Sequence, residues 1–322
     1  MEVPATRQWQ ALSIAVLVPC HDEAATIAQV VRDFSAALPG ATVYVFDNNS
    51  SDGTAQIARA AGAVVRAVSL QGKGNVVRRQ FADVEADIYV LVDGDGTYDA
   101  AAAPLLVDRL ARDGLDMVVG ARRSVQQQAY RAGHRTGNAL LTQCAGRIFG
   151  RSFQDMLSGY RVFSRRYVKS FGAHAAGFET ETELTVHALQ LRMPVAEVAT
   201  DYGVRAQGST SKLNTWRDGW RILATIVKLF KAERPLLFFS IGFAACAAAS
   251  TLLAIPLLVT YMETGLVPRF PTAILCVALM LLGFLLLGCG LILDTVTRGR
   301  IEAKHLAYLR IPMAGQDAAG RK

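Results

Sequence analysis

Apolar and polar positions follow two different periods along the first 120 residues of the chain. Short apolar runs predict strands at 13–19, 42–46, 63–68, 88–92 and 115–120, and the run at 88–92 is typical of a buried strand of a mainly parallel sheet. Apolar residues spaced three or four apart predict helices at 25–38, 54–61, 101–112 and from the glycine loop 71–75 to about 84. Strands alternating with helices predict an α/β fold with a mainly parallel sheet and right-handed crossovers.

The pattern changes in the last quarter of the chain. Residues 236–261 and 270–293 contain no charged residue, and each stretch is long enough to span a bilayer as a helix. A buried core helix is the alternative, but these lengths favour membrane spans. Basic residues flank the pair: Arg217, Arg221, Lys228, Lys231 and Arg234 before it, and Arg298, Arg300, Lys304 and Arg310 after it.

The positive-inside rule places both flanks in the cytoplasm and the short loop 262–269 outside. We therefore expect a multi-pass protein of the cell (inner or plasma) membrane, with its α/β domain and both termini cytoplasmic. In residues 214–231, apolar and basic side chains would fall on different faces of one helix, which predicts a helix lying in the membrane interface. The expected division is an α/β domain at 1–213, a juxtamembrane helix at 214–234, a transmembrane hairpin at 235–294 and a tail at 295–322.

Composition narrows the functional classes. The 322 residues carry 34 Lys and Arg against 27 Asp and Glu, a net charge of +7. No basic run interleaves with stacking aromatics and no zinc-finger spacing occurs, so nucleic acid is not an expected partner. The five cysteines show no CxxC spacing, and we expect free thiols in a reducing compartment.

Polar residues cluster where three of the predicted strands end. They are Pro19, His21 and Glu23 after the first strand, Asp47, Asn49 and Asp52 after the second, and Asp93 and Asp95 after the fourth. The carboxyl ends of parallel strands share one edge, where open α/β sheets bind ligands. Asp93 and Asp95 repel each other unless a cation lies between them, and Mg²⁺ or Mn²⁺ with a substrate phosphate suits such oxygens. A solvated Asp-Gly turn is the alternative.

Other ligand motifs fit poorly. Counted from Asp93, an EF-hand loop would need Gly at Tyr98 and Glu at Pro104. The first strand is not followed by GxGxxG, and Gly72-Lys73-Gly74 lacks the spacing and the Ser or Thr of a Walker sequence.

Four motifs carry a family resemblance. Val18–Glu23, Phe46–Thr54, Gly72–Gly74 and Val92–Asp95 resemble, in kind and order, the motifs of family 2 glycosyltransferases of the GT-A fold. Within that family, residues 13–223 resemble the polyprenyl-phosphate (dolichyl-phosphate) hexose synthases. The resemblance implies that the nucleotide is bound by Pro19, His21, Glu23, Asp47, Asn49, Asp52, Lys73 and Asp93. It also implies that Asp95, with Asp93, holds Mg²⁺ or Mn²⁺, and that Asp155 lies beside the sugar as a catalytic residue.

A basic set in the middle of the chain is the candidate acceptor site. Guanidinium groups match phosphate oxygens in pairs, so an acceptor phosphate would be bound by Arg122, Arg131 and Arg135. Residues 202–213 resemble the family's Arg-x-x-Gly-x-Ser-Lys element, which implies that Arg205 and Lys212 bind the same phosphate. A solvated charged surface is the alternative. Acids near 179–183 begin a helix, where negative charge is favourable, and Glu183 is expected to be structural.

The implied activity is inverting transfer of a hexosyl unit from a nucleotide sugar to polyprenyl phosphate (undecaprenyl or dolichyl), with a UDP-sugar favoured over GDP-mannose. A phosphate acceptor is already ionised at neutral pH, so Asp155 would orient a reactant instead of acting as a strong base. The alternatives are a glycosyltransferase for another lipid or glycan acceptor, and a non-catalytic sugar-nucleotide-binding membrane subunit. A homo-oligomer is expected from the resemblance alone.

Overall fold

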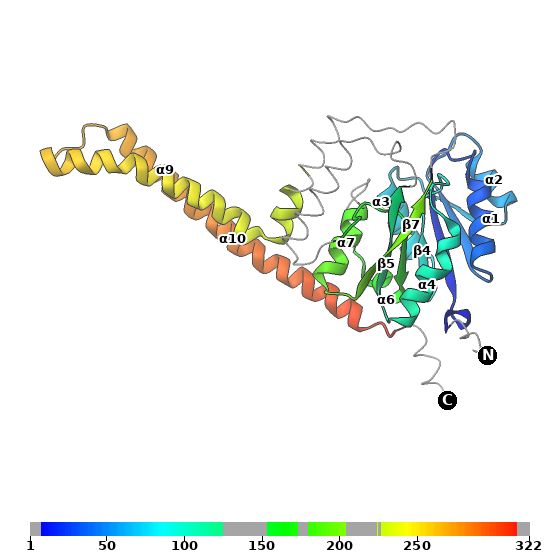
Figure 1. Ribbon diagram of the computed structural model, residues 1–322. Coiled ribbons are helices and arrows are strands. Elements are labelled where there is room, and N and C mark those ends of the chain that lie inside the picture. The colour runs from blue at the N-terminus through cyan, green and yellow to red at the C-terminus, as the bar shows by residue number, and fades with distance from the viewer. Residues whose placement is uncertain (1–7, 125–152, 173–179, 204–223, 225–226, 314–322) are drawn as a thin grey trace. The chain divides into compact units, whose positions relative to one another are not determined.

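The computed structural model describes residues 8–124, 153–172, 180–203, 224 and 227–313 (Figure 1). Its sheet has seven strands in the order β3-β2-β1-β4-β6-β5-β7. The strands are β1 Ile14–Cys20, β2 Thr42–Asp47, β3 Val64–Ala67, β4 Ile88–Leu91, β5 Met117–Ser124, β6 Arg161–Ser164 and β7 Val195–Tyr202. The helices around it are α1 Ile27–Ala37, α2 Thr54–Ala60, α3 Lys73–Asp83, α4 Ala103–Arg112, α6 Arg165–Ser170 and α7 Thr180–Gln190, with 3-10 turns η1 Gln8–Ala11 and η2 Ala100–Ala102.

The sheet is mixed but mostly parallel, which confirms the predicted fold class. Strands β1 to β4 run parallel to one another, and β5 runs parallel to β7. Strand β6 lies antiparallel between β4 and β5, so that Phe163 pairs with Tyr89 on one side and Met117 on the other. The carboxyl ends of β1, β2 and β4 therefore meet at one edge, as the sequence predicted.

Burial explains why the sequence pattern was informative. Every residue of β1 and β4 is buried, because helices cover both faces of the central strands. Neither face of these strands meets water, so their sequences are continuous apolar runs without alternating polar residues. On one face α1 packs with α2 and α4, and α3 packs with α6 and α7 on the other. Helix α1 buries Ile27, Val30, Val31 and Phe34, which is the amphipathic stripe that its spacing predicted.

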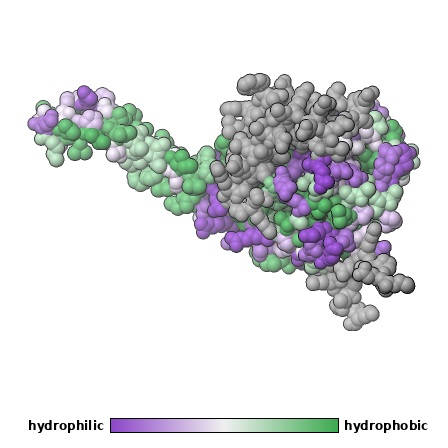
Figure 2. All heavy atoms as spheres, in the orientation of Figure 1, coloured by the Kyte–Doolittle hydropathy of each residue, from purple (hydrophilic) through white to green (hydrophobic). Residues whose placement is uncertain are grey.

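The chain divides into two compact units, 1–222 with 303–322, and 223–302. The second unit holds α9 (Pro235–Thr264) and most of α10 (Phe270–Leu309). By length and composition both helices could cross a membrane, and only 6% and 17% of their most apolar windows are buried within the structure. Figure 2 shows hydrophobic residues along both. The predicted spans, 236–261 and 270–293, fall inside these helices, and α10 continues beyond its span.

Within the second unit the two helices pack closely through small residues. A Cβ on Gly283 would lie 3.3 Å from the Cβ of Cys246, and one on Gly290 would lie 3.0 Å from the Cβ of Phe239. The hydroxyl of Ser250 donates to the carbonyl of Cys276 at 2.8 Å. Small residues let the backbones approach where helices pair without a hydrophobic driving force from water.

Candidate active site

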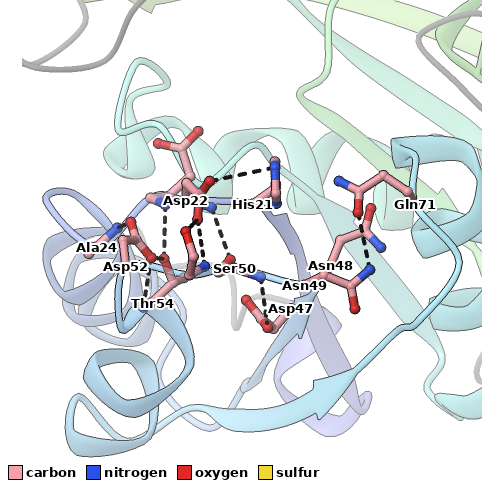
Figure 3. A network of polar contacts seen from close by, with 12 residues as sticks. His21, Asp22, Ala24, Asp47, Asn48, Asn49, Ser50, Asp52, Thr54 and Gln71 are labelled. Atoms are coloured by element: carbon pink, nitrogen blue, oxygen red, sulfur yellow. Dashed lines mark hydrogen bonds and ion pairs between the residues drawn. The ribbon is translucent and has the colours of Figure 1, made fainter.

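The loops after β1 and β2 form one hydrogen-bonded network (Figure 3). The backbone N–H of Asp22 donates to the hydroxyl of Ser50 at 2.9 Å, and the N–H of Ser51 donates to the Asp22 carboxylate at 2.8 Å. Asp22 adopts a left-handed conformation, with φ of 54°, that this exchange stabilises. The ends of β1 and β2 with the loops that follow them, residues 19–24 and 47–54, are thereby joined into one rigid rim.

Asp52 accepts hydrogen bonds from both of these loops. Its carboxylate accepts from the N–H of Ala24 at 2.9 Å and from the hydroxyl of Thr54 at 2.5 Å. Partial burial alone would raise the pKa of Asp52, but these hydrogen bonds lower it below its usual value. The structure thus places Asp52 in the rim, and its predicted contact with nucleotide stays a prediction.

Asp47 ends β2 with one carboxylate oxygen unsatisfied. The residue is 9% exposed, and its Oδ1 has no hydrogen-bond partner among the described residues. The other oxygen, Oδ2, accepts weakly from the N–H of Ser50 at 3.4 Å. A buried polar atom without a partner is expensive, so Oδ1 is suited to accept a donor from a ligand.

Asn48 and Asn49 hold the loop that leads into α3. The Asn48 amide donates to the carbonyls of Val68 and Leu70 at 2.9 and 2.8 Å and accepts from the N–H of Gly72 at 2.7 Å. Asn49 donates to the carbonyl of Ser69 at 2.9 Å. A carboxylate could not make the two donations of Asn48, so the amide fixes where α3 begins.

Lys73, the first residue of α3, bridges two carboxylates. Its Nζ lies 2.5 Å from Oδ1 of Asp93 and 2.5 Å from Oε1 of Glu181, which belongs to α7. Burial alone would lower the pKa of Lys73, but the charges of Asp93 and Glu181 outweigh it and raise the pKa well above its usual value. The lysine is therefore a fixed positive charge at the end of β4.

The loop Asp93–Gly96 is held by close packing. Asp95 is 4% exposed, and its Oδ1 accepts from the Thr97 hydroxyl at 2.6 Å. A Cβ on Gly94 would lie 2.6 Å from Sγ of Cys20, so only glycine allows the loop to approach β1 this closely. The hydroxyl of Thr26 donates to the carbonyl of Gly94 at 2.7 Å and fixes the same turn.

A second loop contacts Asp93 from the other side. A Cβ on Gly159 would lie 2.5 Å from Oδ2 of Asp93. The N–H of Gly159 donates to the hydroxyl of Tyr98 at 2.8 Å. Burial raises the pKa of Tyr98 well above its usual value, and the Asp93 charge raises it further, so the phenol stays neutral. Backbone, tyrosine and lysine together set the position of Asp93.

Arg122 and Asp155 form a part-buried bidentate pair. Nε and Nη2 of Arg122 lie 2.6 and 2.7 Å from the two carboxylate oxygens of Asp155. The carboxylate of Glu197 accepts from the N–H of Asp155 at 3.1 Å and fixes its backbone. The structure thus brings together two residues that the sequence analysis assigned separately to acceptor phosphate and to sugar. A phosphate bound by Arg122 must share it with Asp155.

Some site residues were missed by the sequence analysis, and others lie outside the described residues. Glu181 was treated only as one of the acids that begin α7. Arg161, fully buried, donates to the carbonyls of Ser158 and Met156 and to the Thr185 hydroxyl, and so fixes the loop before Tyr160. Four predicted acceptor residues lie outside the described part of the chain: Arg131, Arg135, Arg205 and Lys212.

The donor set suits a divalent cation that shares a phosphate. Within the described residues no group of three or more His, Cys, Asp or Glu side chains could hold a metal ion by itself. Asp93 and Asp95, with a single residue between them, offer hard carboxylate oxygens. Mg²⁺ and related ions are commonly bound by one or two carboxylates together with substrate phosphates, so this pair fits such an ion only with a phosphorylated substrate.

Comparison with known proteins decides the family. The profile "Glycosyl transferase family 2" matches residues 15–172. Glycosyltransferase AglJ of Haloferax volcanii is 34% identical over 288 residues, covering 88% of this chain and 93% of AglJ. The chain belongs to glycosyl transferase family 2. It is a glycosyltransferase, and the resemblance predicted from its strand-end motifs is confirmed.

Further relatives and one solved structure add detail about the family. An uncharacterized protein of Shigella flexneri is 58% identical over 154 residues, covering 48% of this chain and 94% of that protein. A dolichyl-phosphate hexose transferase of Haloferax volcanii is 28% identical over 221 residues, covering 69% of this chain and 95% of the relative. Glucosyl-3-phosphoglycerate synthase from Mycobacterium tuberculosis, in complex with Mn²⁺, UDP-glucose and glycerol 3-phosphate, superposes with a TM-score of 0.55 at 25% identity, covering 68% of this chain and 80% of that one.

Proposed function

We propose that this glycosyltransferase moves a hexosyl unit from a nucleotide sugar to a polyprenyl phosphate, undecaprenyl or dolichyl. An oxygen of the lipid phosphate attacks the anomeric carbon, the bond from that carbon to the diphosphate breaks, and configuration inverts. The observation that carries the proposal is the presence, in one chain, of a family 2 catalytic domain and two helices of membrane length. The dolichyl-phosphate hexose transferase among its relatives supports the same acceptor class.

The geometry of Asp47 favours uracil as the donor base. Only Oδ1 lacks a partner among the described residues, whereas Oδ2 already faces the N–H of Ser50. Uracil offers one ring N–H between two carbonyls, whereas guanine offers adjacent N–H donors to a whole carboxylate. A single available oxygen suits the uracil edge better. The other nucleotide contacts, from Pro19, His21, Glu23, Asn49 and Asp52, are proposed from their places on the same rim.

Positive charge at the end of β4 would receive the diphosphate. Asp95 and Asp93 are proposed to hold Mg²⁺ or Mn²⁺ together with the diphosphate oxygens, as the Mn²⁺ and UDP-glucose of the solved relative suggest. A bound divalent cation would offset the negative charge of the leaving diphosphate. Lys73 supplies a further fixed positive charge beside Asp93.

The acceptor needs orientation more than activation. A phosphate monoester is ionised at neutral pH, so no general base has to remove a proton from it. Arg122 and Asp155 would position this phosphate beside the sugar, with Arg131, Arg135, Arg205 and Lys212 as the remaining proposed contacts. Helices α9 and α10 would anchor the enzyme in the cell membrane with the catalytic domain and both termini in the cytoplasm.

A donor panel tests the proposal. Purified protein in detergent is supplied with Mn²⁺, undecaprenyl phosphate and, in turn, UDP- and GDP-linked hexoses, and both nucleoside diphosphate and glycolipid are measured. We expect turnover with a UDP-hexose and its loss in Asp95→Ala. Turnover with GDP-mannose alone would contradict the proposed base, and the absence of glycolipid with every donor would contradict the acceptor.

A further inference from the structure

Three carboxylates and one ammonium surround the end of β4. Lys73 contacts Asp93 and Glu181 at 2.5 Å each, and Asp95 follows two residues after Asp93. The Lys73 and Glu181 side chains are 14% and 8% exposed, so their charges are poorly screened by water.

Lys73 and a divalent cation would require the same carboxylate. The Nζ of Lys73 already lies on Oδ1 of Asp93, and the loop at Gly159 closes on Oδ2 of that residue. Two cations on one carboxylate repel each other strongly where water is scarce. Occupation by a metal therefore weakens the Lys73–Asp93 pair, and that pair in turn opposes the metal.

Glu181 gives Lys73 an alternative partner. A buried ammonium that lost Asp93 and had no other carboxylate would be an uncompensated charge. Glu181 comes from a different element, α7, and its 2.5 Å contact with Lys73 does not depend on Asp93 moving. The lysine can shift its charge toward Glu181 when a metal reaches Asp93.

We propose that Lys73 competes with the divalent cation for Asp93, and that Glu181 is a positioning residue that raises metal affinity by holding Lys73. The inference rests on the metal site of the proposed function and assigns to Glu181 a role that acts through another residue. Without Glu181, Lys73 pairs with Asp93 alone and excludes the metal more strongly. Without Lys73, the competition disappears.

Mn²⁺ binding to the full chain in detergent, at one saturating concentration of UDP throughout, tests this directly by electron paramagnetic resonance of free Mn²⁺. We expect Lys73→Met to bind Mn²⁺ about tenfold more tightly and Glu181→Gln about tenfold more weakly than the wild type. In the Lys73→Met background, Glu181→Gln should change affinity by no more than about twofold, because its effect passes through the lysine. Should Lys73→Met not fold, the double variant is compared with Glu181→Gln, and the inference requires it to bind Mn²⁺ more tightly than Glu181→Gln does, because the competing lysine is gone.

Lys169→Met is the matched control, because Lys169 pairs with Glu85 at 2.6 Å elsewhere in the same unit. It should leave Mn²⁺ affinity unchanged. The competition would be overturned if Lys73→Met bound Mn²⁺ as tightly as the wild type or more weakly. It would also be overturned if neither Lys73→Met nor the wild type bound Mn²⁺. An equal loss from Glu181→Gln with and without Lys73 would overturn the indirect role of Glu181.

The same preparations separate this inference from the proposed function. A wild type that transfers sugar to the lipid phosphate, combined with a Lys73→Met variant that binds Mn²⁺ more weakly, contradicts the competition alone. If Lys73→Met binds Mn²⁺ more tightly and the wild type forms no glycolipid with any donor, only the proposed acceptor is contradicted.

Discussion

At the scale of single residues, the position of Asp93 depends on two nearby glycines, Gly94 and Gly159, that have no side chain. Gly94 leaves room for the thiol of Cys20, and Gly159 leaves room for the Asp93 carboxylate itself. Lys73 then draws one oxygen of Asp93 into an ion pair. The carboxylate is thus held by two close approaches and one charge, and small changes at these positions should move it.

Gly159→Ala tests this arrangement. The added methyl group would lie 2.5 Å from Oδ2 of Asp93 and would force the carboxylate or the loop to move. Because a displacement of about 1 Å in an active site can cost about 100-fold in rate, we expect kcat/KM to fall by that order with the fold retained. Gly172→Ala is the control, since nothing lies within 4 Å of its added Cβ. Full activity in Gly159→Ala would contradict the proposed fit.

At the scale of elements, α6 and α7 are joined through a buried histidine. His187 of α7 meets the rings of Tyr167 and Phe171 with centroids at 5.1 and 5.3 Å, and its Nε2 lies 3.1 Å from the hydroxyl of Ser170. Burial, with a smaller contribution from the charge of Lys304, lowers the pKa of His187 to about 3. The helix that carries Glu181 is therefore packed around a neutral imidazole.

This packing predicts acid sensitivity. The unfolded chain protonates His187 near pH 6.5, whereas the folded protein does so only near pH 3, so between these values acid favours the unfolded state. Because of His187, the free energy of unfolding should fall by about 1.4 kcal/mol for each unit by which the pH is lowered within that window. Chemical denaturation at several pH values measures the slope. His187→Gln should reduce it, the exposed His305→Gln should not, and equal slopes in all three proteins would contradict the account.

Elements also show how far the sequence could predict the fold. Strands β1 and β4 were found because burial on both faces leaves their apolar runs unbroken, whereas the apolar run of β3 marks an edge strand whose residues are mostly exposed. Strand β6 was not predicted, since it has four residues and begins with Arg161, a charged residue that is nonetheless fully buried. Its guanidinium is satisfied by carbonyls of the preceding loop, an arrangement that no local pattern reveals.

The candidate site divides in the same way. Pro19, Asp47, Asp93 and Asp95 could be placed from sequence, because strand ends of a parallel sheet share an edge. Glu181 could not, since its partner Lys73 lies 108 positions away in the chain. Likewise, the pairing of Arg122 with Asp155 requires β5 and a loop before β6 to meet in space.

At the scale of the whole molecule, a family 2 catalytic unit and a pair of long apolar helices share one chain. The pair depends on close backbone approach at glycines. Its exposed large apolar residues, which include Leu252, Leu258, Leu285 and Ile292, suit lipid more than water. The catalytic chemistry and the proposed lipid substrate are thus matched by the two parts of the chain.

Gly290→Ala tests the packing of this hairpin. Its added Cβ would lie 3.0 Å from the Cβ of Phe239 and 3.4 Å from the Cα of Leu236, which leaves no flexible atom to give way. We expect a loss of about 1–3 kcal/mol in stability, seen as a lower unfolding temperature in detergent. Gly288→Ala, with nothing within 4 Å of the added Cβ, should leave it unchanged. Equal temperatures for the two variants would contradict the close packing.

The proposed acceptor is tested most directly by comparing two lipids that differ only in their head group. Initial rates of nucleoside diphosphate release are measured with undecaprenyl phosphate and with undecaprenol, at the same UDP-hexose and Mn²⁺ concentrations. We predict release that rises with the lipid phosphate, matches glycolipid formation one for one, and stays at background with the alcohol. Equal release with the alcohol, or release that is independent of either lipid, would contradict a polyprenyl phosphate as the acceptor.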